Sequence, residues 1–201
     1  MNTAQPIKST EDLQKIKAYY KTVHPHPRNY LLIITGLNTA LRISDILSLK
    51  WGDVYELGTG AGKGQIKMHI YIKEKKTGKD ACIFINQNIK DALHAYYQSL
   101  LEQKEQPQAE DFIFTGQKGE NLPITRVQAF RIIKEAAKYC DLEGTISCHS
   151  LRKTFGYHAW KQGTSPALLM HIYHHSSYQV TKCYLGIDQD EQDLVFQNIM
   201  L

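Results

Sequence analysis

One tyrosine, one arginine and two histidines near the end of the chain have the types and order that phosphodiester chemistry requires. His149 and Arg152 lie within one helical turn of each other, and His175 and Tyr184 follow in the same stretch, 148–185. A tyrosine attacks phosphorus once its phenol, whose ordinary pKa is about 10, loses its proton. The pentacoordinate phosphorus that results carries extra negative charge, which fixed cations and hydrogen-bond donors stabilise. The stretch therefore predicts metal-independent attack on a phosphodiester.

The order of these residues resembles the C-terminal signature of tyrosine recombinases, the phage-integrase family. The matching strings are His149-x-x-Arg152, then YHHSS with His175, and then Tyr184. The earlier string TGLNTALRISDILSLKW resembles the family too, and it places Arg42 at the family's first catalytic arginine. Several spaced positions in the right order make this resemblance more specific than any single motif.

The resemblance covers roughly residues 10 to 185 and implies both a fold and a domain organisation. The fold would be α+β and mostly helical, with a helical core like the tyrosine-recombinase catalytic domain and a small antiparallel hairpin on one edge. We expect a flexible leader over residues 1–8 and the catalytic domain over 9–185. A C-terminal tail or helix over 186–201 would dock on a neighbouring protomer or on its own core.

The resemblance also implies a role for each member of a catalytic set. The set is Arg42, Lys76, His149, Arg152, His175 and Tyr184. The two arginines would grip the non-bridging oxygens of the scissile phosphate, because a guanidinium stays charged and bonds bidentately. The tyrosine would attack phosphorus and form a 3′-phosphotyrosyl ester, while the lysine would donate a proton to the departing 5′ oxygen. The first histidine would accept or hold the tyrosine proton, and the second would donate to a phosphate oxygen.

The lysine of this set belongs to a predicted β-hairpin. Apolar residues alternate with polar ones in IKMHIYIK (66–73), the period of a half-buried strand, and ACIFIN (81–86) follows after a glycine-containing link. The link carries Lys75, Lys76 and Lys79. A Lys-Thr-Gly string is where the family has its general acid, so the resemblance favours Lys76, and the other two lysines remain alternatives.

The first arginine is predicted at the entrance of a helix. The apolar run over residues 30–37 predicts a buried helix, followed by a bend and a second helix capped by Ser44. Arg42 then lies at the mouth of that second helix, where anions collect. The alternative is a plain salt bridge to an acid such as Asp45. In the family an acidic residue follows this arginine, so we expect Asp45 to brace Arg42.

Further amphipathic helices are predicted where a capping residue precedes apolar positions at helical spacing. They begin at Ser9, at Asn88 and at Thr125. The segment 149–162 is predicted to be a helix as well, and another begins at 164–166.

Composition restricts the class of protein without identifying it. The 201 residues, with 42% apolar and 22% charged side chains, suit one good-sized soluble domain. A net charge of +4 and a pI near 8.7 permit nucleic-acid binding without demanding it. The sequence shows no apolar run of about 18 residues and no signal-peptide core, so we expect a cytoplasmic protein without a membrane partner. Its four cysteines form no Cys-x-x-Cys pair and are expected to be reduced thiols.

Three other kinds of site are disfavoured. His171, His174 and His175 share a helix face, but no Cys, Asp or Glu lies close by to complete a metal shell, so we expect neither metal nor cofactor. His174 stands where the family usually has glycine. The glycine-rich stretch 57–65 fits neither the Walker A nor the dinucleotide pattern and is interpreted as a connector. No Gly-x-Ser-x-Gly motif supports a serine hydrolase.

The expected partner is double-stranded DNA, with self-association to a tetramer on DNA and a monomer possible when the protein is free. Two alternatives use the same fold. A DNA-binding regulator would bind without recombining, and a type IB topoisomerase-like enzyme would relax DNA without bringing two sites together. Recombination of two plasmid sites, compared with relaxation of one supercoiled plasmid, separates these alternatives.

Overall fold

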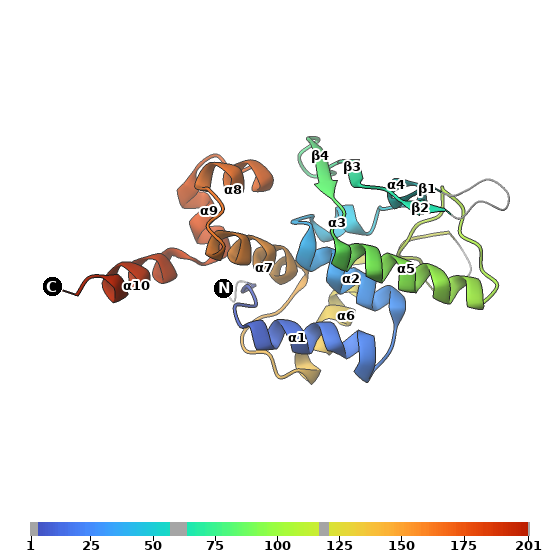
Figure 1. Cartoon of the computed structure of the whole chain (residues 1–201), viewed down its shortest axis with the longest axis horizontal. Coiled ribbons are helices and arrows are strands. Elements are labelled where there is room, and N and C mark those ends of the chain that lie inside the picture. The colour runs from blue at the N-terminus through green and yellow to red at the C-terminus, as the bar shows by residue number, and fades with distance from the viewer. Residues whose placement is uncertain (1–3, 57–63, 117–120, 201) are drawn as a thin grey trace.

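The computed structural model describes residues 4–56, 64–116 and 121–200, and Figure 1 shows how their elements are arranged. In chain order the helices are α1 (Thr10–Ala18), the π-helical η1 (Tyr19–Val23), α2 (Pro27–Asn38), α3 (Ile43–Ile46), α4 (Trp51–Val54), α5 (Gln87–Glu102), α6 (Arg126–Tyr139), α7 (Cys148–Lys161), α8 (Pro166–Tyr173), α9 (Tyr178–Leu185) and α10 (Asp188–Asn198). The strands are β1 (Tyr55–Glu56), β2 (Gln65–Ile66), β3 (His69–Lys73) and β4 (Asp80–Phe84). The mostly helical α+β fold with an antiparallel hairpin at its edge is confirmed.

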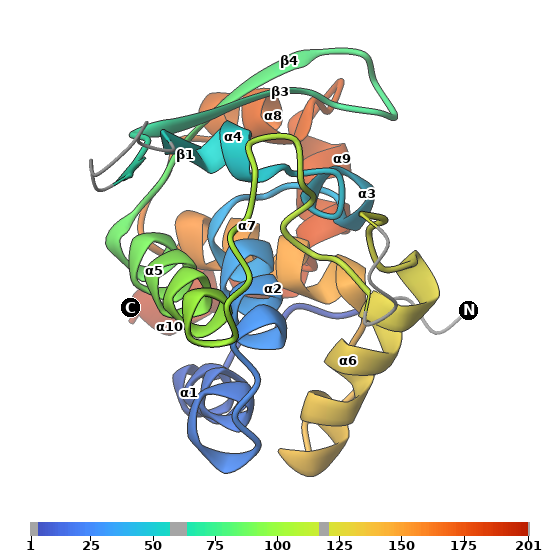
Figure 2. The ribbon, with the colours of Figure 1, turned by 90° about the vertical axis from the view of Figure 1, so that its right-hand side faces the viewer.

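Helix α2 lies at the centre of the domain and packs against both α5 and α7. Its middle residues, Leu31 to Ile34, are all buried, as the apolar run predicted. Pro27 occupies its first turn, where the missing N–H costs nothing. Helix α7 comes so close that a Cβ at Gly36 would lie 2.6 Å from Leu151 Cδ1. Figure 2 shows α2 and α7 side by side in the middle of the molecule.

The connection after α2 differs from the prediction at its cap. Helix α3 begins one residue after Arg42, which is itself the N-cap residue, so the cap predicted at Ser44 is wrong. Ala40 has a positive φ of 54°, which turns the chain sharply before Arg42. Arg42 is therefore held at the mouth of the short helix, as predicted.

The predicted hairpin is confirmed, with His69 opposite Phe84 and Lys73 opposite Asp80. Gly78 takes a left-handed φ of 65° in its turn, a conformation that glycine adopts without strain. In Figures 1 and 2 the hairpin runs along one edge of the domain, beside the short helices α3 and α4. Strands β1 and β2 form a second small antiparallel sheet that the sequence did not indicate.

Of the other three predicted helix caps, two are confirmed. Ser9 accepts from the Asp12 amide, and Thr125 forms a capping box with Gln128. The cap of α5 is Asn86 rather than Asn88, because the Asn86 side chain accepts from the Ile89 amide at 3.1 Å. Of the glycine-rich stretch, residues 57–63 lie outside the described residues.

The first described residues pack against α7 and also contact the first turn of α10. Residues 4–8, where the sequence predicted a flexible leader, lie against α7: Ile7 is buried, and its amide donates to Thr154 Oγ1 at 2.8 Å. Helix α10 extends away from the domain in Figure 1. Its first turn is tied back by Lys8 to Asp190 at 2.6 Å and by Lys182 to Glu191 at 2.9 Å.

A second apolar cluster lies under the last helices and supports the region where the predicted site residues gather. Its buried members are Ala40, Tyr157, Leu169, Tyr173, Leu185 and Ile187. Because Ala40 precedes α3 and the others belong to the C-terminal third, this cluster joins the two halves of the predicted site. No helix in the described part of the chain is long and apolar enough to cross a membrane.

Candidate active site

Five separate segments supply the six residues predicted from the sequence. Arg42 precedes α3, Lys76 lies in the turn between β3 and β4, His149 and Arg152 lie in the first turns of α7, His175 follows α8, and Tyr184 lies near the end of α9. The contacts that follow connect these segments directly.

Arg152 is held in a buried position by its surroundings. Its side chain is only 3% exposed, and its Nη1 donates to the Ala40 carbonyl oxygen. Its guanidinium carbon lies 4.7 Å from the centre of the Tyr173 ring, a cation–π contact. The Tyr173 hydroxyl in turn donates to the Arg152 carbonyl at 2.7 Å. These contacts leave the Arg152 side chain little freedom to change its position.

Glu74, at the end of β3, connects the two arginines. Its Oε2 lies 2.6 Å from Arg42 Nη1, and its Oε1 lies 4.0 Å from Arg152 Nη1. Burial by itself raises the pKa of Glu74. The hydrogen bond from Thr77, together with the hydrogen bond and charge of Arg42, outweighs burial and lowers that pKa. The carboxylate is therefore ionised and holds two cations that belong to distant parts of the sequence.

The predicted brace for Arg42 is wrong. Asp45 does not pair with Arg42 in the described structure; its Oδ1 accepts the backbone amide of Lys75 at 2.9 Å. Asp45 lies within α3, whereas Arg42 points to the hairpin and pairs with Glu74. The two acids thus make different contacts: Asp45 binds the hairpin backbone, and Glu74 binds Arg42.

Tyr184 packs between an aromatic ring and an imidazole. Its ring centre lies 5.5 Å from that of Tyr173 and 5.2 Å from that of His175. Burial raises the pKa of the Tyr184 phenol, and the charges of Arg152 and Arg42 oppose that rise. The phenol is therefore protonated at neutral pH and lies near the two guanidinium groups that favour its ionised form.

A threonine fixes the ring of His175. Thr181, which is fully buried on α9, places its Oγ1 3.1 Å from His175 Nδ1. The other ring nitrogen, Nε2, is then available on the side of the ring away from that contact. Burial lowers the pKa of His175, and the charges of Arg152 and Arg42 lower it further. The imidazole is neutral at pH 7 and can donate one hydrogen bond from the nitrogen that carries its proton.

His174, which stands where the family usually has glycine, adopts the backbone conformation that glycine favours. It caps α8 in the left-handed conformation, with φ 56° and ψ 39°, where glycine has no steric penalty. The turn before His175 therefore keeps the geometry that glycine would provide, although a histidine adopts it at a cost of about 1 kcal/mol. The His174 Nε2 lies 3.7 Å from Glu74 Oε2, so the side chain also approaches the acid that links the arginines.

His149 lies in the first turn of α7, one helical turn before Arg152. Partial desolvation lowers the pKa of His149, and the charges of Arg152, Lys153, Arg42 and Lys76 add to that effect. Lys76 itself is exposed in the turn. Contacts through Glu74 and Tyr173 bring Arg42, Arg152, His175 and Tyr184 together. His149 shares α7 with Arg152, and in the described residues no hydrogen bond or ion pair joins Lys76 to the other five.

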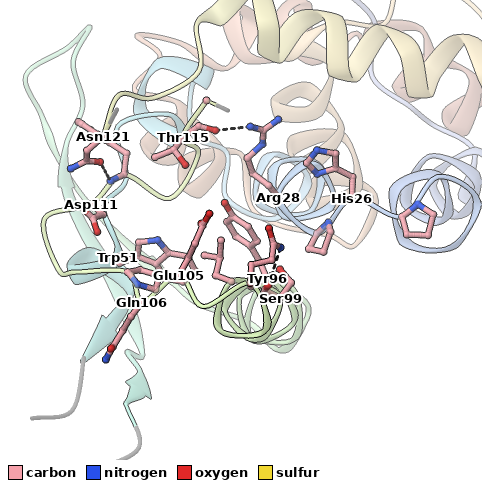
Figure 3. Close-up of a pocket in the computed structure, with 17 residues that line it drawn as sticks. His26, Arg28, Trp51, Tyr96, Ser99, Glu105, Gln106, Asp111, Thr115 and Asn121 are labelled. Atoms are coloured by element: carbon pink, nitrogen blue, oxygen red, sulfur yellow. Dashed lines mark hydrogen bonds between the residues drawn. The ribbon is translucent and has the colours of Figure 1, made fainter. Parts of the chain in front are cut away.

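A pocket in the described structure lies elsewhere. Figure 3 shows it between the start of α2 and the end of α5, where Arg28 donates to the Thr115 carbonyl at 2.5 Å. Glu105 and Asp111 also line it, and none of the six predicted catalytic residues does. Within the described residues, no group of three or more His, Cys, Asp or Glu could hold a metal ion.

Sequence reasoning missed three residues that hold this site together: Glu74, Tyr173 and Thr181. Tyr173 and Thr181 lie among the residues that the family pattern spans, but as an aromatic and a hydroxyl at helical spacing they looked like ordinary core positions. Glu74 is one of two acids in the lysine-rich hairpin link over 74–80, the other being Asp80, and nothing in the sequence distinguishes it as the partner of Arg42.

The chain is similar to known proteins in sequence and in fold. The sequence matches the Phage integrase family over residues 9–191. It is 39% identical over 190 residues to a Bacillus subtilis (strain 168) protein named "Probable integrase/recombinase YoeC", covering 94% of this chain and 93% of that protein. Tyrosine recombinase XerD of Listeria monocytogenes serotype 4b (strain F2365) is 24% identical, over 90% of this chain and 58% of that protein. The chain thus spans little more than half the length of this second relative.

Two crystal structures show the shared fold. XerA recombinase superposes with a TM-score of 0.74 at 18% identity, covering 99% of this chain and 67% of that one. XerH site-specific recombinase, in a post-cleavage complex with its palindromic difH substrate, gives 0.72 at 20% identity over 94% of this chain and 51% of that one. Since the family match spans most of the sequence, the chain belongs to the phage integrase family of tyrosine recombinases, enzymes that cleave and rejoin DNA strands.

Proposed function

We propose that this chain carries out site-specific recombination of double-stranded DNA through a covalent 3′-phosphotyrosyl intermediate formed on Tyr184. The observation that carries the proposal is the position of the Tyr184 ring, 5.2 Å from His175 and within the influence of the charges of Arg152 and Arg42. A phenol beside two guanidinium groups is where a phosphate would be both bound and attacked. The XerH structure, a post-cleavage complex with DNA, supports the same use of the shared fold.

Arg42 and Arg152 bind the two non-bridging oxygens of the scissile phosphate in this proposal. A guanidinium has five N–H donors, so an arginine can keep one structural partner and still present others to an anion. Each oxygen gains negative charge as Tyr184 attacks, and the two cations stabilise that charge more in the transition state than before it. His175 donates to one of the same oxygens through Nε2, in the neutral tautomer in which Nδ1 accepts from the Thr181 hydroxyl.

Two proton transfers accompany attack. His149 accepts the phenol proton as the Tyr184 oxygen bonds to phosphorus, and Lys76 donates a proton to the 5′ oxygen as its bond to phosphorus breaks. The phosphotyrosyl ester keeps the phosphodiester bond energy, so a 5′ hydroxyl of another strand can attack it and release the tyrosine. Rejoining therefore needs no nucleotide cofactor.

The pH dependence of cleavage should report on His149. Because desolvation and neighbouring cations lower its pKa, the imidazole is neutral at pH 7 and able to accept a proton. We expect the single-turnover rate at saturating DNA to stay level down to the ordinary histidine pKa of about 6.5 and to fall at lower pH. His149→Gln should be slower and lack this acid limb. A wild-type rate that increases on acidification would contradict the base role.

Trapping the covalent intermediate tests the proposed function. The purified protein is incubated with a pool of nicked host-derived duplex DNA, denatured with detergent, and assayed for DNA that stays attached to protein. Trypsin cleaves after Lys182, and the peptide 183–201 contains Tyr184 as its one tyrosine. We expect the nucleotide remnant on this peptide, and sequencing of the attached DNA should reveal a common site.

The same DNA separates the alternative functions. Two plasmid copies of the recovered site should recombine. Relaxation of a single supercoiled plasmid without recombination would favour a topoisomerase-like enzyme, and DNA binding without any adduct would favour a regulator. Either result would reject the proposal.

We also propose that copies of the chain assemble into a tetramer on DNA through the apolar residues of α10. Leu194, Val195 and Phe196 are all exposed there, and Phe196 is 78% exposed. We expect Phe196→Glu to bind a single site normally but to lose the tetramer when its complexes are weighed by analytical ultracentrifugation. Gln192→Glu adds the same charge at an exposed polar position of the same helix and should assemble like wild type. Equal tetramer content in both variants would mean that α10 packs elsewhere.

A further inference from the structure

We propose that Glu74 is a positioning residue for strand cleavage: it fixes the Arg42 guanidinium to the hairpin that carries Lys76. Its role is to hold Arg42, which binds the phosphate, and Lys76, which donates the proton, in fixed positions relative to each other. This inference rests on the proposed function, because it assigns to Glu74 an effect on the chemistry of that same site. Sequence reasoning had given the bracing role to Asp45, which the structure uses for a different contact.

The side-chain contacts of Glu74 show how it holds Arg42. Its Oε2 accepts from Arg42 Nη1 at 2.6 Å and from Thr77 Oγ1 at 2.8 Å. Its Oε1 faces Arg152, 4.0 Å from Nη1. The Glu74 side chain is 3% exposed and the Arg42 side chain 18%, so the pair is largely withdrawn from water. Because the Glu74 carboxylate has contacts on both sides, it fixes the direction in which the Arg42 guanidinium points.

Backbone contacts fix Glu74 to the hairpin turn. Its amide donates to the Lys79 carbonyl at 2.9 Å, and its carbonyl accepts from the Gly78 amide at 2.8 Å. These two bonds close the turn in which Lys76 lies. Movement of Glu74 would therefore move the turn, and the position of Arg42 is coupled to the position of Lys76.

The contact with Glu74 leaves Arg42 able to bind phosphate. The recorded bond uses Nη1 alone, whereas the guanidinium also has donors on Nε and Nη2. Arg152 is buried nearby with the same charge, and the carboxylate between them offsets the repulsion of the two cations. Without Glu74, Arg42 would keep its charge but lose the contact that directs it.

Loss of Glu74 should affect binding and chemistry in opposite directions. Removing a negative charge from a phosphate site does not weaken attraction to DNA, so affinity should be unchanged or tighter. A misdirected arginine stabilises the transition state less, so cleavage of bound DNA should slow. A variant that merely loses its fold would lose binding and cleavage together. The split between the two measurements therefore distinguishes positioning from a purely structural role.

The test uses single-turnover cleavage of a nicked duplex that carries the site recovered from wild-type adducts. DNA affinity is measured separately in the Tyr184→Phe background, where no cleavage occurs. We expect Glu74→Ala to cleave about 10²-fold more slowly at saturating DNA. Glu74→Gln keeps an oxygen that can accept from Arg42, and it should recover to within about tenfold of wild type. Glu110→Ala is the control, because Glu110 is 84% exposed and pairs with Lys50 at the surface.

Each outcome decides the inference. Slower cleavage with undiminished affinity in the Ala variant, and partial recovery in the Gln variant, supports positioning. If the Ala variant does not fold, the Gln variant alone carries the test through its slower rate and retained affinity. Wild-type rates in both variants, faster cleavage, or parallel loss of affinity and rate in the Gln variant would overturn the inference. Absence of any wild-type adduct would instead reject the proposed function itself.

Discussion

Tyr184→Phe is expected to abolish the covalent adduct while the protein still folds and binds DNA. The substitution removes one oxygen, the atom that would bond to phosphorus, and leaves the ring between Tyr173 and His175 in place. Loss of a nucleophile can cost on the order of 10⁶ in rate, so no adduct should be detectable. Circular dichroism and a DNA-binding titration check that fold and affinity are retained.

The matched control for this variant lies on the same helix. Tyr178→Phe also removes a hydroxyl from α9, one that donates to Glu191 at 2.5 Å and lies outside the cluster of predicted residues. It should form adduct at the wild-type rate, with a loss of stability of about 1 kcal/mol from the missing hydrogen bond. An adduct that persists in Tyr184→Phe would assign the attack to a different nucleophile, and peptide mapping would identify it.

The placements on helices and turns that the sequence predicted are those that follow from local spacing. His149 and Arg152 share the first turns of α7, His175 lies in the turn between α8 and α9, and Tyr184 lies near the end of α9. Here a helical period and a turn are enough to bring side chains to one side of the chain. The alternating strands and the glycine turn likewise predicted the hairpin.

The contacts between segments could not be predicted in the same way. Glu74 and Arg42 are separated by 32 positions, and nothing in their local pattern says that the hairpin folds back over α3. Asp45 was expected to brace Arg42 because the family has an acidic residue after this arginine. The tertiary position of the hairpin decided the pairing instead, because it brings the Lys75 amide to Asp45 and the Glu74 side chain to Arg42.

His174 shows a backbone requirement that the sequence concealed. A histidine stands at position 174, where the family usually has glycine. The structure keeps the left-handed conformation, because the α8 C-terminus requires it whichever residue is present. The family pattern, which has glycine at this position, therefore predicted the left-handed backbone conformation correctly, although a histidine does not by itself indicate it.

Arg152→Lys is expected to lower both cleavage and stability, although the charge is conserved. Lysine lacks the planar fork that binds two phosphate oxygens and that lies over the Tyr173 ring at 4.7 Å. We expect cleavage at saturating DNA to fall by about 10²- to 10³-fold. Stability should fall by about 1–2 kcal/mol, since the buried Ala40 carbonyl loses its guanidinium donor. Single-turnover cleavage and urea denaturation measure the two effects.

Arg42→Lys separates the effect on cleavage from the effect on stability. Arg42 is more exposed than Arg152, and its recorded hydrogen bond is the one to Glu74, which a lysine ammonium can also make. We therefore expect a comparable loss of cleavage, because the bidentate phosphate contact is gone, with a smaller change in the urea midpoint. If both variants lost equal stability, the Ala40 and Tyr173 contacts would contribute nothing specific to the fold. If Arg152→Lys cleaved normally, its guanidinium would serve packing alone, and the phosphate would be held by other cations.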